Sequence, residues 1–302
     1  MARANGKVIL LGEHAVVYGV PAIAAGIGKG ATAIAVPAER PLLVLGAERV
    51  VRAGEDDELG RAFTALHAAT GVGSYRIDVT LELPPGAGLG ASASIGVATA
   101  RALFEASGIE AGRERVLEAA GAWERVFHGN PSGIDAEAAA CEACILYSRA
   151  DGARPIAVAG EVPLVIGIAG PSASTRVMVE GVAELRQRKP EVVDKAMAGI
   201  LALVNAAKGC LGVGDLRGLG RLMDLNQMLL SGLFVSTEGI ERACAVARAA
   251  GALGAKLTGS GGGGAVIALA PGDPEVILSA FRSEGIQCFA TTVGASSGGT
   301  RR

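Results

Sequence analysis

One stretch in the first third of the chain limits the possible folds more than any other, because its hydrophobic period changes halfway. Over residues 76–83 apolar and polar side chains alternate, which is the pattern of a half-buried strand. From Ile95 to a stop at Gly108 the apolar residues recur at helical spacing. A glycine-rich loop joins the two patterns. The fold must therefore place strands and helices next to each other along the chain.

The loop between these two patterns has the properties of a phosphate-binding loop. Its glycines let the backbone approach a ligand and point successive N–H groups at it. The following helix start adds partial positive charge, and Ser92 and Ser94 can cap that helix or offer a hydroxyl to a metal ion. A capped turn without a ligand is the simpler alternative, and we favour phosphate binding. The predicted cofactor-binding residues are Pro85, Gly86, Ala87, Gly88, Leu89, Gly90, Ala91, Ser92, Ala93 and Ser94.

Composition narrows the class of protein. The chain has 302 residues, is 50% hydrophobic and carries a net charge of −2, so we expect neither a nucleic-acid partner nor an anionic membrane. No signal peptide or apolar run of about 18 residues is apparent. The five cysteines are odd in number and irregularly spaced, which fits reduced thiols in the cytoplasm. We interpret Cys141 and Cys144 as packing residues.

A polar pair interrupts the apolar beginning of the chain. Residues 7–11 form a short apolar strand, followed by Glu13 and His14 between glycines. Such a pair is either a satisfied buried pair in a hairpin or a substrate contact at a rigid strand end.

A long helix is predicted over residues 112–127, with Val116, Ala120, Trp123 and Phe127 in a buried stripe. Glu124 lies on the adjacent stripe. The segment after the helix turns at residues 129–131, and Ser132 is predicted to cap a new helix that begins close to Asp135. Asp135 is then either a capping acid or a reactive carboxylate.

The second half repeats a mixture of strands and helices. Helices are predicted over residues 175–188, 190–208, 215–231, 237–250 and 274–283, and strands over 162–169, 265–270 and 286–293. A second glycine-rich loop covers residues 259–264 between two apolar strands, and it can lie against a ligand. Residues 151–155 are the predicted linker. We expect domains over residues 1–153 and 154–295, with a tail over 296–302.

Four of these segments together resemble the mevalonate kinases of the GHMP superfamily of small-molecule kinases. The resemblance rests on Lys-Val-Ile-Leu-Leu-Gly-Glu-His-Ala-Val-Val from Lys7, Pro-x-x-x-Gly-Leu-Gly-x-Ser-Ala at the loop, His-Gly-Asn-Pro-Ser-Gly-Ile-Asp ending at Asp135, and Lys-Leu-Thr-Gly-Ser-Gly-Gly-Gly-Gly from Lys256. It implies an α+β, two-domain fold: an N-terminal domain like ribosomal protein S5 domain 2 and a ferredoxin-like C-terminal domain, with the site in the cleft between them.

The resemblance also implies roles for particular residues. Asp135 is the expected catalytic base and Lys7 the expected charge stabiliser, with ATP over the first glycine-rich loop and Mg²⁺ held by Ser92 and Glu124. Ala91 replaces a serine that many members have, but the metal-ligating serine is kept as Ser92. The acceptor is expected to be the primary hydroxyl of mevalonate. The expected substrate contacts are Glu13, His14, Thr175, Gly261 and Gly262.

Several alternatives remain open at this point. Phosphomevalonate kinase is the nearest, although its acceptor carries a phosphate and needs additional basic side chains. A diphosphomevalonate decarboxylase, a galactokinase and a homoserine kinase fit the motifs less well. A nucleotide-binding regulator without catalysis is the alternative of a different class, and it should have lost Lys7, Glu124 or Asp135, which are all present. We also expect a homodimer.

Overall fold

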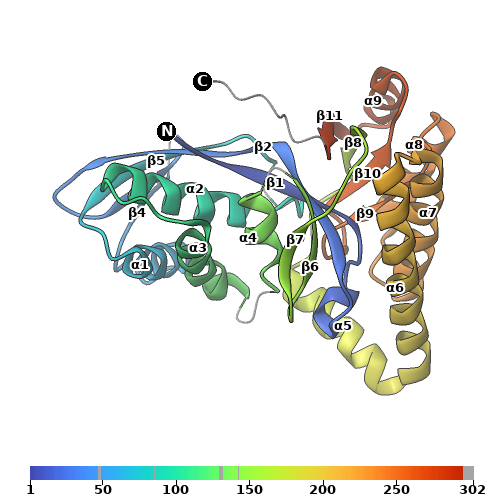
Figure 1. Ribbon diagram of the computed structural model, residues 1–302, viewed down its shortest axis with the longest axis horizontal. Coiled ribbons are helices and arrows are strands. Elements are labelled where there is room, and N and C mark those ends of the chain that lie inside the picture. The colour runs from blue at the N-terminus through green and yellow to red at the C-terminus, as the bar shows by residue number, and fades with distance from the viewer. Residues whose placement is uncertain (47–48, 85, 129–131, 142, 295–302) are drawn as a thin grey trace. The chain divides into compact units, whose positions relative to one another are not determined.

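A computed structural model describes residues 1–46, 49–84, 86–128, 132–141 and 143–294 (Figure 1). The chain separates into two compact units, each assembled from separate segments. Unit 1 comprises Met1–Lys7, Gly28–Pro85 and Gly90–Cys141, and unit 2 comprises Val8–Ile27, Gly86–Leu89 and Glu142–Arg302. Strands β1 (Ala2–Leu11) and β2 (Ala22–Pro37) therefore contribute residues to both units. The predicted boundary at residues 153–154 divides the chain differently and stays a prediction.

The strands of unit 1 run in the order β4-β3-β5-β2. They are β3 (Leu42–Leu45), β4 (Arg49–Arg52), β5 (Tyr75–Leu81) and the later part of β2. Strand β5 is parallel to β3 and antiparallel to β2. Ile77 and Val79 are buried while Arg76 and Thr80 are exposed, which confirms the alternating strand predicted for this segment.

Helices α1 (Glu58–Thr70), α2 (Ala91–Ala106) and α3 (Arg113–His128) pack against one another in unit 1 and, with the short helix α4 (Ile134–Ala139), cover its strands (Figure 1). The predicted stripe on α3 is confirmed for Val116, Ala120 and Trp123, which are buried. Phe127, its fourth predicted member, is only partly buried and packs against the same core. The large side chains of this core include Phe63, Leu66, Leu103 and Trp123.

Residues 151–155 are not the linker that the sequence predicted. They contain most of β7 (Gly152–Pro155), which pairs antiparallel with β6 (Cys144–Ser148), and β6 pairs with the first part of β2. The Asp-Gly and Arg-Pro dipeptides suggested a break in structure. An edge strand that ends in proline tolerates both, because the proline has no ladder hydrogen bond to lose.

The second sheet lies wholly in unit 2, in the order β11-β8-β10-β9. Its strands are β8 (Val162–Ile168), β9 (Ala255–Thr258), β10 (Ala265–Leu269) and β11 (Gln287–Val293), and each pairs antiparallel with its neighbours. The 3-10 turn η1 (Ala15–Tyr18) and the helices α5 (Thr175–Arg188), α6 (Pro190–Val213), α7 (Leu216–Gly232), α8 (Glu238–Ala249) and α9 (Pro274–Ser283) complete the unit. Helices α8 and α9 contact the sheet, and α7 contacts β9.

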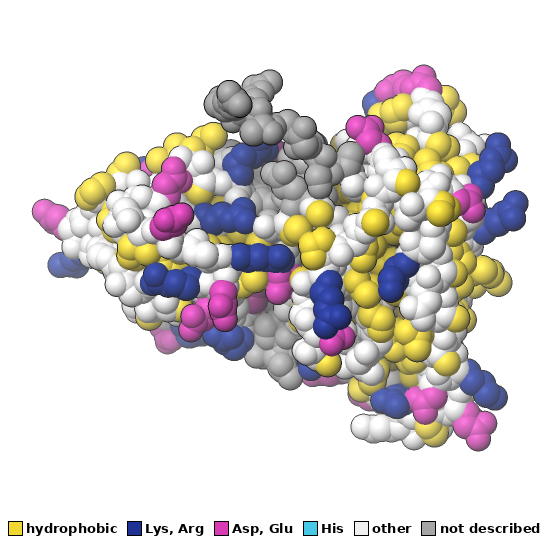
Figure 2. Space-filling model, in the orientation of Figure 1, with side chains coloured by type: hydrophobic (Ala, Val, Ile, Leu, Met, Phe, Trp, Pro, Cys, Tyr) yellow, Lys and Arg dark blue, Asp and Glu magenta, His cyan; other side chains and the backbone are white. Residues whose placement is uncertain are grey.

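Helix α6 is longer than the sequence predicted. Gly209 and Gly212 continue the helix, and it ends where Gly214 adopts a left-handed backbone with φ of 74°. By length and composition alone α6 could cross a membrane, with a mean hydropathy of 1.6 over 18 residues. One such helix is weak support for a membrane span. Helix α6 packs against α5 and α7, and apolar and charged side chains mix on the surface over α6 and α7 (Figure 2).

Candidate active site

Lys7 and Asp135 form an ion pair in unit 1. Lys7 Nζ lies 3.1 Å from Asp135 Oδ1, and the side chains are 4% and 36% exposed. Asp135 is in the first turn of α4, which begins after Gly133 in a left-handed conformation. Ser132 was predicted to cap this helix, but Gly133, which has no side chain, occupies the N-cap position. The pair therefore joins an enclosed ammonium to a carboxylate that solvent can reach.

Ser92 and Glu124 form a second polar pair in the same unit. The Ser92 hydroxyl donates to Glu124 Oε1, and Trp123 Nε1 donates to the Ser92 oxygen at 3.0 Å. Burial raises the pKa of Glu124 to about 7; the Ser92 hydrogen bond and Lys7 oppose this shift, and Asp135 adds to it. The four groups are thus close enough to act on one another electrostatically.

Ser92 and Glu124 present a hydroxyl and a carboxylate oxygen side by side, which are the hard ligands that Mg²⁺ prefers. No cluster of three or more His, Cys, Asp or Glu side chains occurs among the residues that the structure describes. Mg²⁺ in phosphoryl-transfer enzymes typically has one or two protein carboxylates, with substrate phosphates and water completing its shell. The donor set therefore fits such an ion.

The first glycine-rich loop divides between the units, with residues 86–89 in unit 2 and residues 90–94 in unit 1. Gly86, Gly88 and Gly90 all have φ between 70° and 77°. A side chain at Gly90 would meet Lys7, whose Cγ lies 2.6 Å from the Cβ position. Pro85 is outside the described residues, as are the residues 129–131 of the Asp135 motif.

The serines of this loop do not cap helix α2 as predicted. Gly90 occupies the N-cap position, and no side chain in the described structure makes the capping hydrogen bond. Ser94 is fully buried and donates instead to the Asn5 carbonyl, while Ser92 bonds Glu124. The first N–H groups of α2 consequently lack a side-chain cap, which suits an anionic ligand.

Glu13 and His14 lie in unit 2, directly after β1. The Glu13 carboxylate forms an ion pair with Lys256 Nζ and accepts from Asn226 Nδ2 at 3.3 Å. The side chains of Glu13 and Lys256 are both 0% exposed. The sequence left two alternatives for Glu13, a buried group with its partners inside the protein or a substrate contact. Its contacts with Lys256 and Asn226 favour the first alternative.

His14 has a strained backbone and a defined hydrogen bond. Its φ is 61°, a left-handed value that is uncommon for residues other than glycine. His14 Nε2 lies 2.8 Å from the carbonyl oxygen of Ser260. A carbonyl can only accept, so Nε2 carries the proton and Nδ1 is the remaining acceptor. Burial lowers the pKa of His14, which favours this neutral form.

The second glycine-rich loop packs closely against its own unit. A side chain at Gly261 would meet the Val235 carbonyl, and one at Gly262 would meet Met178 and Ala173. All its residues except Ser260 have positive φ. Thr175 Oγ1 donates to Ser260 Oγ at 3.4 Å. The structure therefore brings Thr175, His14 and this loop together, and close packing within the protein accounts for glycine at positions 261 and 262.

Lys256, Asn226 and Trp123 were not among the predicted site residues. The sequence could have identified Lys256 and Asn226, because each is a polar residue at an otherwise apolar position of its strand or helix. Trp123 was assigned only to the core stripe, yet its indole N–H bonds Ser92.

Two family profiles match the chain: "GHMP kinases N terminal domain" over residues 57–143 and "GHMP kinases C terminal" over residues 200–287. A mevalonate kinase of Thermococcus gammatolerans is 34% identical, covering 94% of this chain and 93% of that protein. A mevalonate kinase of Methanothermobacter thermautotrophicus is also 34% identical, with 93% of each chain covered. Among solved structures, L. major mevalonate kinase in complex with R-mevalonate superposes with a TM-score of 0.88 at 33% identity, covering 97% of this chain and 95% of that one.

Proposed function

The chain belongs to the GHMP kinases and, within them, to the mevalonate kinases, and from that premise we propose that it transfers the γ-phosphoryl group of ATP to the primary hydroxyl of mevalonate. The products are 5-phosphomevalonate and ADP. The observation that carries the proposal is the Lys7–Asp135 ion pair beside the Ser92–Glu124 pair. A regulator that had lost catalysis would have no need for these four groups in one cluster.

Asp135 and Lys7 would act on the reacting hydroxyl. The hydroxyl oxygen forms a bond to the γ-phosphorus while its proton passes to the Asp135 carboxylate, and the bond from the γ-phosphorus to the bridging oxygen breaks to release ADP. Lys7 stabilises negative charge on Asp135 before the transfer and on the phosphoryl oxygens during it. Phosphoryl transfer has a loose transition state, so positioning and charge contribute more than the strength of the base.

The other residues would bind and orient ATP, Mg²⁺ and the acceptor. Backbone N–H groups of residues 86–94 would hold the ATP phosphates, and Ser92 with Glu124 would hold Mg²⁺, which would supply positive charge against the phosphates. His14 Nδ1 accepts a hydrogen bond from the acceptor, and Thr175, Gly261 and Gly262 contribute to the acceptor site. Glu13 belongs to the same turn as His14 and supports it.

The test is ADP release from the purified protein with ATP, Mg²⁺ and each of four acceptors: mevalonate, phosphomevalonate, galactose and homoserine. We expect mevalonate to give the largest kcat/KM. Faster turnover with phosphomevalonate would leave the kinase assignment intact and overturn the acceptor. ATP binding without ADP release from any acceptor would favour the regulator.

The homodimer and the cytoplasmic location predicted from the sequence remain proposals. Light scattering on the eluting protein and fractionation of the source cells test them.

A further inference from the structure

The segment that carries Glu13 and His14 is held by every second residue along β9 and the loop after it, namely Lys256, Thr258 and Ser260. Lys256 pairs with Glu13, Thr258 Oγ1 accepts from the Ile9 N–H at 2.7 Å, and the Ser260 carbonyl accepts from His14. Lys256 and Thr258 are two residues apart on β9, so their side chains point to the same face of the strand. The end of β1 and the turn after it are therefore fixed to that face by these two side chains and to the following loop by the Ser260 carbonyl.

Glu13 is enclosed and its oxygens are occupied. One carboxylate oxygen pairs with Lys256 and the other accepts from Asn226, which is itself 0% exposed. Lys256 Nζ also donates to the Leu257 carbonyl at 2.6 Å. A carboxylate with 0% exposure and hydrogen-bond partners on both oxygens fixes the positions of the residues around it. It has no surface to offer a substrate.

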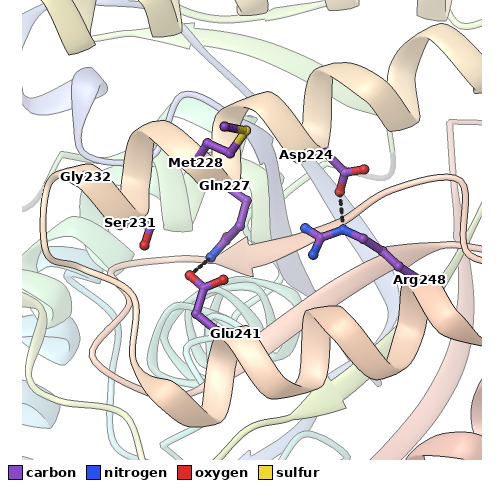
Figure 3. A pocket seen from close by; sticks show the side chains of 7 residues that line it. All are labelled: Asp224, Gln227, Met228, Ser231, Gly232, Glu241 and Arg248. Carbon is purple, nitrogen blue, oxygen red and sulfur yellow. Dashed lines mark hydrogen bonds and ion pairs between the residues drawn. The ribbon is translucent and has the colours of Figure 1, made fainter.

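The outer edge of β9 is fixed by helices α7 and α8, around an open pocket of about 530 Å³ (Figure 3). Asp224 accepts from the Ala255 N–H at 3.0 Å, and Arg248 donates to the Ala255 carbonyl at 2.8 Å. Gln227 accepts from the Leu257 N–H at 2.8 Å and donates to Glu241. The polar side chains of this pocket are thus engaged in holding the strand that carries Lys256.

His14 needs such support because its backbone is strained. A residue other than glycine in the left-handed region costs of order 1–3 kcal/mol, and the surrounding structure must over-determine it. The Glu13–Lys256 pair lies one residue before that strained position.

We propose that Lys256 and Asn226 are positioning residues for the phosphoryl acceptor, which act through Glu13 to fix His14, and that Glu13 does not touch the substrate. The inference rests on the proposed function in naming mevalonate as the acceptor and in placing His14 at the acceptor. It assigns a role to two residues outside the catalytic cluster, and it changes the role of Glu13 from substrate contact to support.

The test is a double-mutant cycle of Glu13→Gln and Lys256→Met, with steady-state kinetics for both substrates and thermal unfolding of every variant. Each single change leaves a buried charge without its partner, so each should raise the KM for mevalonate by roughly tenfold or more. The KM for ATP should change by less than about twofold. The double variant removes both charges, so its KM for mevalonate should fall below that of either single variant.

The direct-contact alternative makes the opposite prediction. If Glu13 binds the substrate, the double variant is at least as impaired as Glu13→Gln, and the inference is overturned. An equal rise in both KM values, which indicates general loosening, also overturns it. Lys208→Met, at an exposed lysine of α6, is the matched control and should behave like the unaltered protein. Should the unaltered protein prefer another acceptor, the proposed substrate fails, and the same ranking measured with that acceptor still decides the role of Lys256.

Discussion

The two lysine–carboxylate pairs of this protein differ in what solvent can reach. In unit 1, Lys7 is enclosed but Asp135 is 36% exposed. In unit 2, neither Lys256 nor Glu13 has any exposed side-chain surface. An open carboxylate can exchange its partner for a substrate group, while a closed one can only hold the structure around it. We therefore propose that the same pair of residue types supports chemistry in one unit and positioning in the other.

The largest expected effect falls on the open carboxylate. Asp135→Asn keeps the shape of the side chain but removes the proton acceptor and the charge. Loss of a general base typically costs about 10²–10⁴ in rate, so we expect kcat to fall in that range while ATP binding, measured by calorimetry, persists. Near-normal turnover would make Asp135 a helix-terminal acid with no part in the reaction.

Replacing the lysine of each pair should lower the free energy of unfolding by different amounts in the two pairs. Lys256→Met leaves Glu13 charged and fully enclosed, and breaking a buried pair in this way costs about 3–5 kcal/mol. Lys7→Met leaves Asp135 in contact with water, so we expect a loss of about 1 kcal/mol. Urea unfolding of both variants gives the two free energies. Equal losses would mean that exposure does not distinguish the pairs.

The pH dependence of stability should report Glu124, the buried acid beside the open pair. Its pKa is raised from 4.5 to about 7, so between these pH values the unfolded chain releases a proton that the folded chain keeps. The free energy of unfolding therefore falls as pH rises through this window, by roughly 3 kcal/mol in total, and stays level above it. Glu124→Gln should flatten the curve in metal-free urea unfolding between pH 4 and 8.

The carboxyl group of Glu124 also allows the proposed metal binding to be tested. The proposed Mg²⁺ ligand is the ionised form of Glu124, so added Mg²⁺ should stabilise the protein more at pH 8 than at pH 5. Ser92→Ala and Glu124→Gln should each raise the Mg²⁺ concentration needed for half-maximal rate. Unchanged metal dependence in both variants would place the ion elsewhere.

The smallest expected effect on stability concerns two residues of unit 2 whose backbones are strained. His14 and Phe234 both have φ of 61°, but His14 is 5% exposed and Phe234 is 77% exposed. Phe234→Gly should stabilise the protein by about 1 kcal/mol, because relief of the left-handed strain exceeds the entropy that glycine adds to the unfolded chain. His14→Gly should relieve similar strain and raise the KM for mevalonate. A destabilised Phe234→Gly variant in thermal unfolding would contradict this account.

The sequence predicted most elements, and its motifs and the family resemblance identified all four groups in unit 1. Lys7, Glu124 and Asp135 are separated by long stretches of chain, and only the family resemblance linked them before the fold was known. Ser92 was expected as a cap or a metal ligand; its hydroxyl bonds Glu124 and does not cap α2, and its role as a metal ligand stays a prediction.

The sequence could not predict the pairing of Glu13 with Lys256, because the two are 243 positions apart and meet through tertiary structure. Both lie in recognisable motifs, so each was assigned by itself and the contact was missed. The capping errors at Ser92, Ser94 and Ser132 have a common cause. A left-handed glycine precedes each helix start and takes the N-cap position, which frees the serines for other partners.

The side chains that fix β9 also protect it from other chains. This strand forms one edge of its sheet, and an edge with free N–H and C=O groups is a template for intermolecular pairing and aggregation. Asp224 and Arg248 satisfy the outward N–H and carbonyl of Ala255, Gln227 satisfies the N–H of Leu257, and Lys256 satisfies the Leu257 carbonyl. A neighbouring molecule therefore finds no open ladder on which to add a strand at these two residues, because their donors and acceptors are already occupied.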